Sequence, residues 1–313
     1  MRATREQISL PEGHSFRLLR WTASVEDVGV VIGPGRSVPM KGEGAHWHYH
    51  VAMELTLFTS GEGTRFVGDH IAPFGPGDLV LLGEKLPHYW HTHGSSAGLS
   101  VQWEFPHGHA FWGFPETLAL AMLFKSAGRG LRFTGATAGV VRAGMHDLAQ
   151  STGPERLGVL LRVFARMAAA PEKERMLLSE RAFALPAGSG HQQAMAEAVR
   201  YLLANYRDEL RLEEVLRLTA MSKPTFSRLF KKHSGKTFSE FVSQIRLQAA
   251  CRELVETERS VLEIALSSGF SQVSFFNRIF RRSLHCSPTQ YREKARRRAS
   301  VEKRRSAQRS AGN

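Results

Sequence analysis

The sequence predicts an α+β protein of two domains, with an N-terminal β-barrel or sandwich, flanking helices and an all-α C-terminal domain. Its 313 residues are more than one typical core requires. Residues 16–105 contain short apolar runs that Gly and Pro interrupt every several residues, which is typical of antiparallel β structure. From residue 114 onward, apolar side chains recur at three- and four-residue spacing, and this spacing predicts amphipathic helices.

Changes of composition place the expected domain boundaries. A β-barrel over residues 1–110 is followed by helices in 111–182, whose apolar faces need a partner in the barrel or in a second copy of the chain. Segment 183–190 contains Gly and Pro and is expected to be a linker, after which the helical pattern resumes in 191–292. Residues 293–313 are basic and almost without apolar side chains, so we expect them to be disordered.

Composition argues against several classes of protein. No run of about 18 apolar residues occurs, so no membrane-spanning helix is expected. The N-terminus MRATREQISLPEGHSF lacks the apolar core of a signal peptide, which predicts a cytoplasmic protein. The two cysteines, Cys251 and Cys286, have no metal-ligand spacing and are interpreted as packing residues.

Positive charge is concentrated near the C-terminus. Residues 1–189 contain 18 Lys and Arg against 17 Asp and Glu, whereas residues 190–313 contain 24 against 12. A polyanionic partner explains this asymmetry, because Lys and Arg release condensed counterions when they contact phosphates. A solvated basic surface is the alternative. Histidine is distributed in the opposite way, with nine of the 14 between His46 and His109, so the two halves are expected to perform different chemistry.

The C-terminal part repeats itself at a period of about fifty residues. Segment 222–232, SKPTFSRLFKK, corresponds to segment 271–282, SQVSFFNRIFRR, and LEEVLRLTAM before the first corresponds to VLEIALSSGF before the second. The offset is 49 at the start of these segments and 50 from the pair Phe226 and Phe276 onward, so the second copy has one added residue. Two copies of one small unit are the simplest interpretation.

Each copy has the parts of a helix-turn-helix. In the second copy, Gly269 permits the sharp turn by tolerating positive φ, and Ser271 is expected to cap the helix that follows. Apolar side chains at helical spacing predict the buried faces, which are Val261, Ile264 and Ala265, then Phe276, Ile279 and Phe280 in the second copy, and Phe226, Leu229 and Phe230 in the first.

Basic and polar side chains remain on the other faces of the second helix in each copy. Such a helix fits the major groove of DNA, where Arg reads guanine edges and flanking basic residues hold phosphates. A helical bundle with a solvated basic face is the alternative, but the repeat, the turn signals and the charge together favour DNA. The residues expected to contact DNA are Lys223, Pro224, Ser227, Arg228, Lys231, Lys232, Gln272, Val273, Ser274, Asn277, Arg278, Arg281 and Arg282.

These motifs lead to a family resemblance. The segments MSKPTFSRLFKKHSGKTFSEF, SVLEIALSSGFSQVSFFNRIF and CSPTQYR lie in a stretch, 191–292, that resembles the DNA-binding domain of AraC/XylS-type transcription regulators. The resemblance implies seven helices, with a long central helix at about Thr237 to Val255 that holds two reading helices about 34 Å apart, in successive major-groove turns. It also implies base contacts by Pro224, Ser227, Arg228, Val273, Ser274, Asn277 and Arg278, with Arg228 and Arg278 the strongest candidates because both are long, forked donors.

The sequence departs from this family's pattern at four positions. Leu216 replaces a usual small Ala and Ala220 replaces the usual turn Gly in the first copy. Glu253 replaces a usual Leu, and His285 replaces a usual Gly. The first copy is therefore expected to dock less regularly than the second.

The histidine-rich half carries a second pattern. Its spacing matches the first cupin motif and, with departures at Gly83 and Lys85, the second, through Gly42, His48, His50, Glu54, Gly61, Gly77, Asp78 and His88. This resembles the small cupin-like β-barrel sensor domain that many AraC-type regulators carry.

The cupin-like residues have a coherent ligand chemistry. His48 and His50 are two residues apart and are expected to point to the same side of a strand. With Glu54 and His88 they form a set of imidazoles and one carboxylate that suits a divalent metal, Fe, Mn, Ni or Zn. A metal-free pocket for an organic effector and a purely structural role are the alternatives, and no cofactor is required by the rest of the sequence.

The sequence as a whole predicts a transcription regulator and not an enzyme. A small molecule or metal in the barrel is expected to change how two DNA-binding domains of a homodimer are presented to double-stranded promoter DNA, with RNA polymerase as a further partner. One alternative is a metal-dependent cupin enzyme, an oxygenase or an isomerase, with an accessory DNA-binding domain. Another is an architectural protein that coats DNA without sequence preference.

Overall fold

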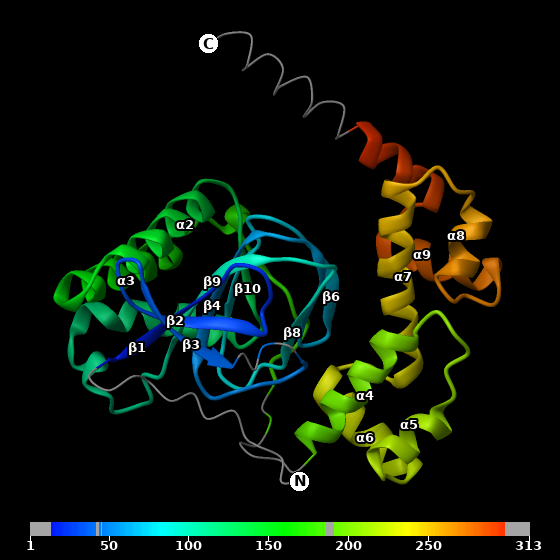
Figure 1. Cartoon of the computed structure of the whole chain (residues 1–313), viewed down its shortest axis with the longest axis horizontal. Coiled ribbons are helices and arrows are strands. Elements are labelled where there is room, and N and C mark those ends of the chain that lie inside the picture. Colours follow the sequence, from blue (N-terminus) through cyan, green and yellow to red (C-terminus); the bar gives the residue numbers. More distant parts are fainter. Residues whose placement is uncertain (1–13, 42–43, 45, 184, 186–190, 298–313) are drawn as a thin grey trace. The chain divides into compact units, whose positions relative to one another are not determined.

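A computed structural model describes residues 14–41, 44, 46–183, 185 and 191–297 (Figure 1). Two compact units are distinguished, residues 1–197 with 224–235, and residues 198–223 with 236–313. The N-terminal region is rich in strands and the C-terminal region is helical, as the sequence predicts. None of the described helices combines the length and the apolar character needed to cross a membrane.

An antiparallel sheet of eight strands forms the centre of the N-terminal region. Its order is β11 (Arg175–Leu177), β10 (Leu131–Phe133), β7 (Leu79–Leu82), β4 (Met53–Ser60), β9 (Ala97–Trp103), β1 (Phe16–Trp21), β2 (Asp27–Gly33) and β3 (Arg36–Lys41). A second sheet has the order β6 (His70–Phe74), β5 (Gly63–Val67) and β8 (His88–Thr92). The strands thus form two sheets, and closure into a cupin-like barrel stays a prediction.

One face of the large sheet is covered by helices. Two short 3₁₀ helices, η1 (Ala110–Gly113) and η2 (Pro115–Leu120), precede α1 (Ala121–Ala127), α2 (Gly135–Gln150) and α3 (Gly153–Ala168), while η3 (Glu172–Glu174) precedes β11. Leu55, Leu81 and Val101 of the sheet share one buried cluster with Val141 of α2 and Phe164 of α3. The helices predicted in this region are confirmed, but the three-residue strands β10 and β11 were not expected there.

The other face of the large sheet lies toward the small sheet. Successive side chains of a strand point to opposite faces. In β7, Leu79 and Leu81 therefore join the cluster under the helices, whereas Val80 and Leu82 join a second buried cluster with Phe74 and Trp90 of the small sheet. This interior between the sheets contains the histidine cluster described below.

The C-terminal region is entirely helical in its described part. Six named helices are α4 (Gln192–Asn205), α5 (Leu212–Thr219), α6 (Lys223–Ser234), α7 (Phe238–Glu256), α8 (Val261–Ser267) and α9 (Val273–Leu284), and residues 288–297 form a seventh. The number of helices and the long central helix α7 agree with the family resemblance. Thr237 and Glu240 start α7 with a capping box, in which the Thr237 hydroxyl accepts from the backbone N–H of Glu240 and the Glu240 carboxylate accepts from the backbone N–H of Thr237.

Two predicted boundaries can be compared with the structure only in part. The seventh helix continues to residue 297, so the disordered tail predicted from residue 293 is wrong over its first five residues, where Glu, Lys, Ala and Arg are all good helix formers. Residues 298–313 lie outside the described residues. Most of the predicted linker, residues 184 and 186–190, also lies outside them, and the other domain boundaries stay predictions.

Candidate functional site

The second helix-turn-helix is formed by α8 and α9 around a glycine turn. Gly269 has φ of +91°. A Cβ at this position would lie 2.5 Å from the carbonyl oxygen of Tyr206 and 2.8 Å from Nε of Arg246, so only glycine fits here. The predicted role of Gly269 is confirmed. The predicted cap is not, because the N-cap residue of α9 is Gln272 and its side chain makes no capping hydrogen bond.

The apolar stripe of α9 is buried as the spacing predicts. Phe276 and Phe280 are fully buried, and their rings are 5.4 Å apart. They share a cluster with Ile264 and Ala265 of α8, which are also fully buried, and with Leu254 of α7. The cluster fixes α9 against α7 and α8, so the opposite face of α9 is held in a defined orientation.

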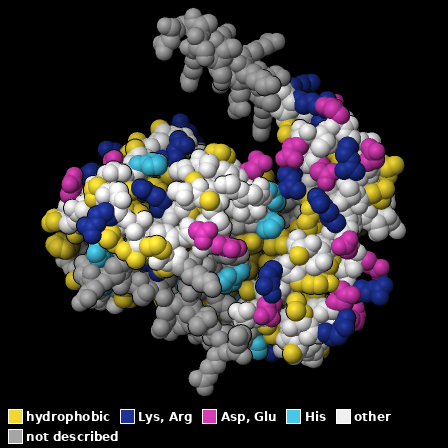
Figure 2. Space-filling model, in the orientation of Figure 1, with side chains coloured by type: hydrophobic (Ala, Val, Ile, Leu, Met, Phe, Trp, Pro, Cys, Tyr) yellow, Lys and Arg dark blue, Asp and Glu magenta, His cyan; other side chains and the backbone are white. Residues whose placement is uncertain are grey.

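Most of the predicted DNA-contacting side chains of α9 lie on that opposite face, but Val273 packs against the buried cluster. Asn277 and Val273 are half-buried. The guanidinium of Arg278 lies over the ring of Phe275, 5.2 Å from its centroid, and this contact restricts the rotamers of Arg278. Exposed side chains are Gln272, Ser274, Arg278, Arg281 and Arg282. Figure 2 shows acidic and basic side chains interspersed on one face of the molecule. Net charge alone would therefore not identify a DNA-binding helix.

The predicted contact residues of the first copy lie on α6. Phe226 and Phe230 are buried, with ring centroids 5.1 Å apart, and Leu229 is half-buried, as the apolar stripe predicts. The exposed side chains include every residue predicted to contact DNA from this helix, Lys223, Pro224, Ser227, Arg228, Lys231 and Lys232. The structure thus leaves all six accessible, while their contacts with DNA stay a prediction.

Three departures from the family patterns fall at strained backbone positions. Ala220, which ends α5, has φ of +51°, His285, which ends α9, has φ of +53°, and Lys85 has φ of +57°. Each of these residues stands where the corresponding pattern has Gly. The left-handed conformation costs a residue with a Cβ about 1–2 kcal/mol of conformational free energy. The backbone at these positions is therefore left-handed although Gly, the residue that adopts this conformation most easily, is absent.

Ala220→Gly is expected to stabilise the protein by up to about 1 kcal/mol, because relief of the left-handed strain exceeds the added freedom of glycine in the unfolded chain. Chemical denaturation monitored by circular dichroism measures this change. The matched control is Ala204→Gly, at an exposed position of α4, which is expected to cost about 0.5–1 kcal/mol. Destabilisation by both substitutions would contradict strain at Ala220.

Another departure, Glu253, replaces an apolar side chain with one that makes polar contacts. Oε2 of Glu253 lies 2.7 Å from the Arg259 guanidinium and accepts a hydrogen bond of 3.1 Å from the Ser267 hydroxyl. Oε1 lies 3.8 Å from the guanidinium of Arg207. Glu253 of α7 therefore contacts the end of α8, the segment before α8 and the segment after α4. These contacts accommodate an acidic residue at a site that usually holds Leu.

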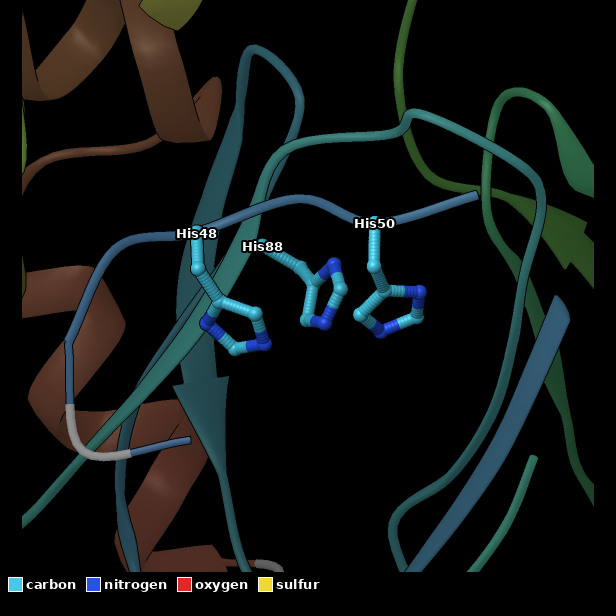
Figure 3. Close-up of side chains that lie close together, drawn as sticks. All are labelled: His48, His50 and His88. Carbon is cyan, nitrogen blue, oxygen red and sulfur yellow. The ribbon is translucent and has the colours of Figure 1, made fainter. Parts of the chain in front are cut away.

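Three histidines of the N-terminal region converge between the two sheets. His48 and His88 exchange backbone hydrogen bonds of 3.2 and 2.9 Å, and their ring centroids are 4.2 Å apart. The three imidazoles of His48, His50 and His88 offer ligand nitrogens that all lie within 4.8 Å of one another. Figure 3 shows the rings side by side, with His88 between the other two. The prediction that His48 and His50 lie on one strand was wrong. His48 forms only an isolated bridge, and His50 lies outside any strand.

Backbone carbonyl groups orient all three imidazole rings. Nδ1 of His48 lies 2.7 Å from the oxygen of His46, Nδ1 of His50 lies 2.9 Å from that of Ala52, and Nδ1 of His88 lies 2.8 Å from that of Leu86. A carbonyl oxygen only accepts, so each Nδ1 carries the hydrogen and each neutral ring presents a lone pair at Nε2. Metal-binding histidines are held by the same kind of outer hydrogen bond.

Glu54 completes the cluster with a buried carboxylate. Its Oε2 lies 3.0 Å from Nε2 of His50 and 3.8 Å from Nε2 of His88. Gln102 donates to the same oxygen at 2.7 Å, and the hydroxyl of Thr56 donates to Oε1. Burial raises the pKa of Glu54, but the hydrogen bond from His50 and the charges of His88 and His50 outweigh it and hold the pKa well below the usual value. Burial lowers the pKa of His88 well below its usual value, helped by His48.

The chemistry of these groups can be compared with that of metal-binding sites. A proton on Nε2 of His50, or a cation between the two atoms, would satisfy its 3.0 Å contact with Oε2 of Glu54. Among the described residues, Nε2 of His88 is buried and has no hydrogen-bond partner. Imidazole nitrogens with one carboxylate are ligands that suit Fe, Mn, Ni or Zn, so the residues present fit such an ion.

The cluster opens into a cavity of about 70 Å³, several times the 10–15 Å³ that one water requires. Three adjacent strands line it with alternate residues, all from the face of the large sheet that points away from the helices. These are Arg17, Leu19 and Trp21 of β1, Ser100 and Gln102 of β9, and Glu54, Thr56 and Phe58 of β4. The sequence did not indicate Arg17, Thr56 or Gln102, because only the register of the strands brings them to His88.

Comparison with known proteins identifies the C-terminal part of the chain. A family model described as a helix-turn-helix domain matches residues 215–294. Regulatory protein SoxS of Salmonella typhimurium is 30% identical over 104 residues, which cover 33% of this chain and 97% of SoxS. The chain belongs to the AraC family of transcription regulators.

Other relatives of this AraC-family protein match about a third of its length. Regulatory protein PocR of Salmonella typhimurium is 38% identical over 103 residues, 33% of this chain, and the match spans only 34% of the length of PocR. The solved structure of a probable AraC family transcriptional regulator from Rhodopseudomonas palustris is 28% identical, with a TM-score of 0.32, and covers 33% of this chain and 97% of that one.

Proposed function

We propose that this AraC-family protein is a sequence-specific DNA-binding regulator that is controlled by an effector, a small molecule or a metal ion, bound between its two N-terminal sheets. The observation that carries the proposal is the buried set of His48, His50, His88 and Glu54, in which Nε2 of His88 has no hydrogen-bond partner among the described residues, in the same chain as the two helix-turn-helix units. A buried nitrogen without a partner is costly unless a ligand completes it.

The DNA-binding step rests on the exposed faces of α6 and α9. These helices present Arg228 and Arg278 on the sides opposite their buried phenylalanines. Arg side chains read guanine through two parallel hydrogen bonds in the major groove, and the neighbouring Lys and Arg side chains hold phosphates. A double-stranded promoter with two appropriately spaced half-sites is therefore the proposed DNA partner.

The effector step rests on the metal-like set of ligands. His48, His50 and His88 would hold the ion through Nε2, and Glu54 would hold it through its carboxylate. When bound, a divalent ion supplies positive charge and a Lewis acid that attracts an oxygen atom of a further ligand. Gln102 and Thr56 keep the Glu54 carboxylate oriented, and the carbonyl groups at Nδ1 keep the three rings oriented.

Pairing of two chains and contact with RNA polymerase are further parts of the proposal. Three large apolar side chains in and just before η2 and α1 are exposed, namely Phe114 (65%), Leu118 (58%) and Met122 (68%). A second copy of the chain would cover these side chains, which supports the dimer predicted for residues 111–182. RNA polymerase is proposed as a partner because regulation of transcription requires a response of that enzyme.

The test is the effect of metal on DNA binding by the full-length protein. Genomic fragments retained by the purified protein supply the DNA probe, and fluorescence anisotropy measures its dissociation constant with and without Zn²⁺, Mn²⁺, Fe²⁺ or Ni²⁺. We expect one ion to bind stoichiometrically and to change DNA affinity by about 5- to 150-fold, the usual range of coupling between sites. His88→Ala should abolish this change.

The matched control is His93→Ala, which removes an exposed imidazole outside the cluster. It should keep both metal binding and the change in DNA affinity. Unchanged DNA affinity with every ion would contradict metal sensing. Turnover of a substrate that requires His48 and the ion, without any effect on DNA binding, would instead favour the metal-dependent oxygenase or isomerase.

A further inference from the structure

Three rows of residues cross the face of the large sheet that lines the cavity. Each row takes one residue from each of the adjacent strands β1, β9 and β4, which pair in register. The first row is Arg17, Gln102 and Glu54, the second is Leu19, Ser100 and Thr56, and the third is Trp21, Gly98 and Phe58. Polar side chains therefore form the first row, which includes Glu54 of the histidine cluster, whereas the side chains of the third row are aromatic.

The polar side chains of the first row are hydrogen-bonded to one another. Nε of Arg17 donates to Oε1 of Gln102 at 2.5 Å, and Nε2 of Gln102 donates to Oε2 of Glu54 at 2.7 Å. Nη1 of Arg17 lies 3.6 Å from the sulfur of Met40, and the hydroxyl of Thr56 donates to Oε1 of Glu54. These contacts are made within the wall of the cavity, so these side chains do not need a ligand to pair them.

The third row is aromatic because a glycine leaves room for the rings. A Cβ at Gly98 would lie 2.3 Å from Cζ2 of Trp21, so the indole occupies the space over this glycine. The ring of Phe58 lies 5.1 Å from that of Trp21 and 5.8 Å from that of Trp90 of the small sheet. Val28 of β2 belongs to the same buried cluster and also lines the cavity. Nε1 of Trp21 is itself buried, so this part of the lining is mainly apolar.

The size and the lining of the cavity limit what it can hold. Its volume is about 70 Å³ and one water requires about 10–15 Å³, so a ligand of about five to seven non-hydrogen atoms fits. A polar group of that ligand beside the third row would lose its hydrogen bonds to water, because the rings there offer few replacements. The lining thus favours a molecule with one polar end and an apolar body.

We infer that the molecule bound in this cavity is a small alcohol, with its one hydroxyl at the histidine cluster and its apolar body at the third row. The inference rests on the proposed function, in which this cavity holds the effector, and it adds the chemical class of that effector. A hydroxyl suits the cluster, because its oxygen can bind a metal ion and its hydrogen can be donated to an acceptor. A second carboxylate would be repelled by that of Glu54, and a sugar would place further hydroxyls beside Trp21 and Phe58.

The experiment compares alcohols with diols of the same size on the full-length protein. Zn²⁺ stoichiometry is measured first, by isothermal titration. Metal-free and Zn²⁺-loaded protein are then titrated with n-pentanol and with butane-1,4-diol, in which a hydroxyl replaces the terminal methyl group. Tryptophan fluorescence is the readout, because Trp21 and Trp90 line the cavity. We expect n-pentanol to bind about tenfold more tightly than the diol, or more, since the added hydroxyl is buried without a partner. Equal binding, or tighter binding of the diol, would overturn the inference.

Two buried valines of β2 locate the body of the bound alcohol. Val28 lines the cavity, whereas Val31 belongs to the cluster under the helices. Val28→Ala should raise the affinity for n-hexanol relative to n-pentanol by about fourfold, the usual gain from burying one more CH₂ group. Val31→Ala, the matched control, should leave this ratio unchanged. The same ratio in both variants would place the alcohol outside the cavity and overturn the inference.

Two further outcomes separate this inference from the proposed function. A preference for n-pentanol in a protein that binds no Zn²⁺ would support the alcohol and contradict the metal site. Anisotropy with the selected DNA fragment then measures whether n-pentanol changes DNA affinity. An alcohol that binds in the cavity without any change in DNA affinity, when no ion changes it either, would support the ligand class and contradict control of DNA binding by this cavity.

Discussion

Phe276→Ala is expected to destabilise the second helix-turn-helix by about 3–5 kcal/mol, the usual cost of truncating a fully buried phenylalanine. The ring of Phe276 is 0% exposed and lies 5.0 Å from the ring of Phe270 and 5.4 Å from that of Phe280. Truncation removes these contacts and leaves a cavity between α7, α8 and α9. The loss is a large part of the 5–15 kcal/mol that stabilises a typical domain.

Hydrogen exchange followed by mass spectrometry measures this effect in the full-length protein. Amide protection in peptides from α8 and α9 should fall by roughly 100- to 1000-fold or more, since each 1.4 kcal/mol is a factor of ten. Phe275→Ala is the matched control, because it makes the same chemical change at the adjacent, half-buried position. Equal losses of protection in the two variants would contradict the packing of the second unit around Phe276.

The periodic features of the C-terminal region could be predicted from the sequence because they are local. The spacing of Phe276 and Phe280 identifies the buried face of α9, and the glycine at position 269 identifies the turn. Helix capping is also local, yet Ser271 was interpreted wrongly as the cap. The added residue in the second copy makes Gln272 the N-cap of α9, so Ser271 lies one position too early to cap the helix.

The histidine cluster could be predicted only in outline. The cupin-like spacing identified the three imidazoles and Glu54, and the structure brings all four together. No motif or spacing in the sequence indicated Arg17 or Gln102. These residues are 85 positions apart and meet only because β1 pairs with β9. Alternation along a strand specifies a face, but the register between distant strands decides which polar groups share that face.

The departures from the family patterns show a different limit. The sequence shows that Ala220 and His285 stand where the family pattern has Gly. It does not show whether the backbone at these positions changes conformation or stays left-handed. The structure shows that the backbone kept its left-handed conformation at both positions. At Glu253 the surroundings adapted instead, through Arg259, Ser267 and Arg207.

Arg278→Ala is expected to weaken binding to the preferred DNA site by about 1–3 kcal/mol and to remove the preference at one base pair. Arg278 is exposed on α9, and the ring of Phe275 orients its guanidinium at 5.2 Å before DNA is bound. A long donor that is already restricted loses less conformational freedom when it pairs with a base edge. Anisotropy titrations with the selected fragment and with variants of it at each position measure both effects.

Arg282→Ala is the matched control, because it removes the same guanidinium from another exposed position of α9. A side chain that contacts only phosphate should weaken binding to every sequence by a similar factor and reduce the dependence on salt, without any change of preference. If Arg278→Ala behaves in the same way, the protein binds DNA through charge alone and the architectural alternative is correct. A loss confined to one base position would show instead that α9 reads the sequence, and that its phenylalanine core serves to aim Arg278.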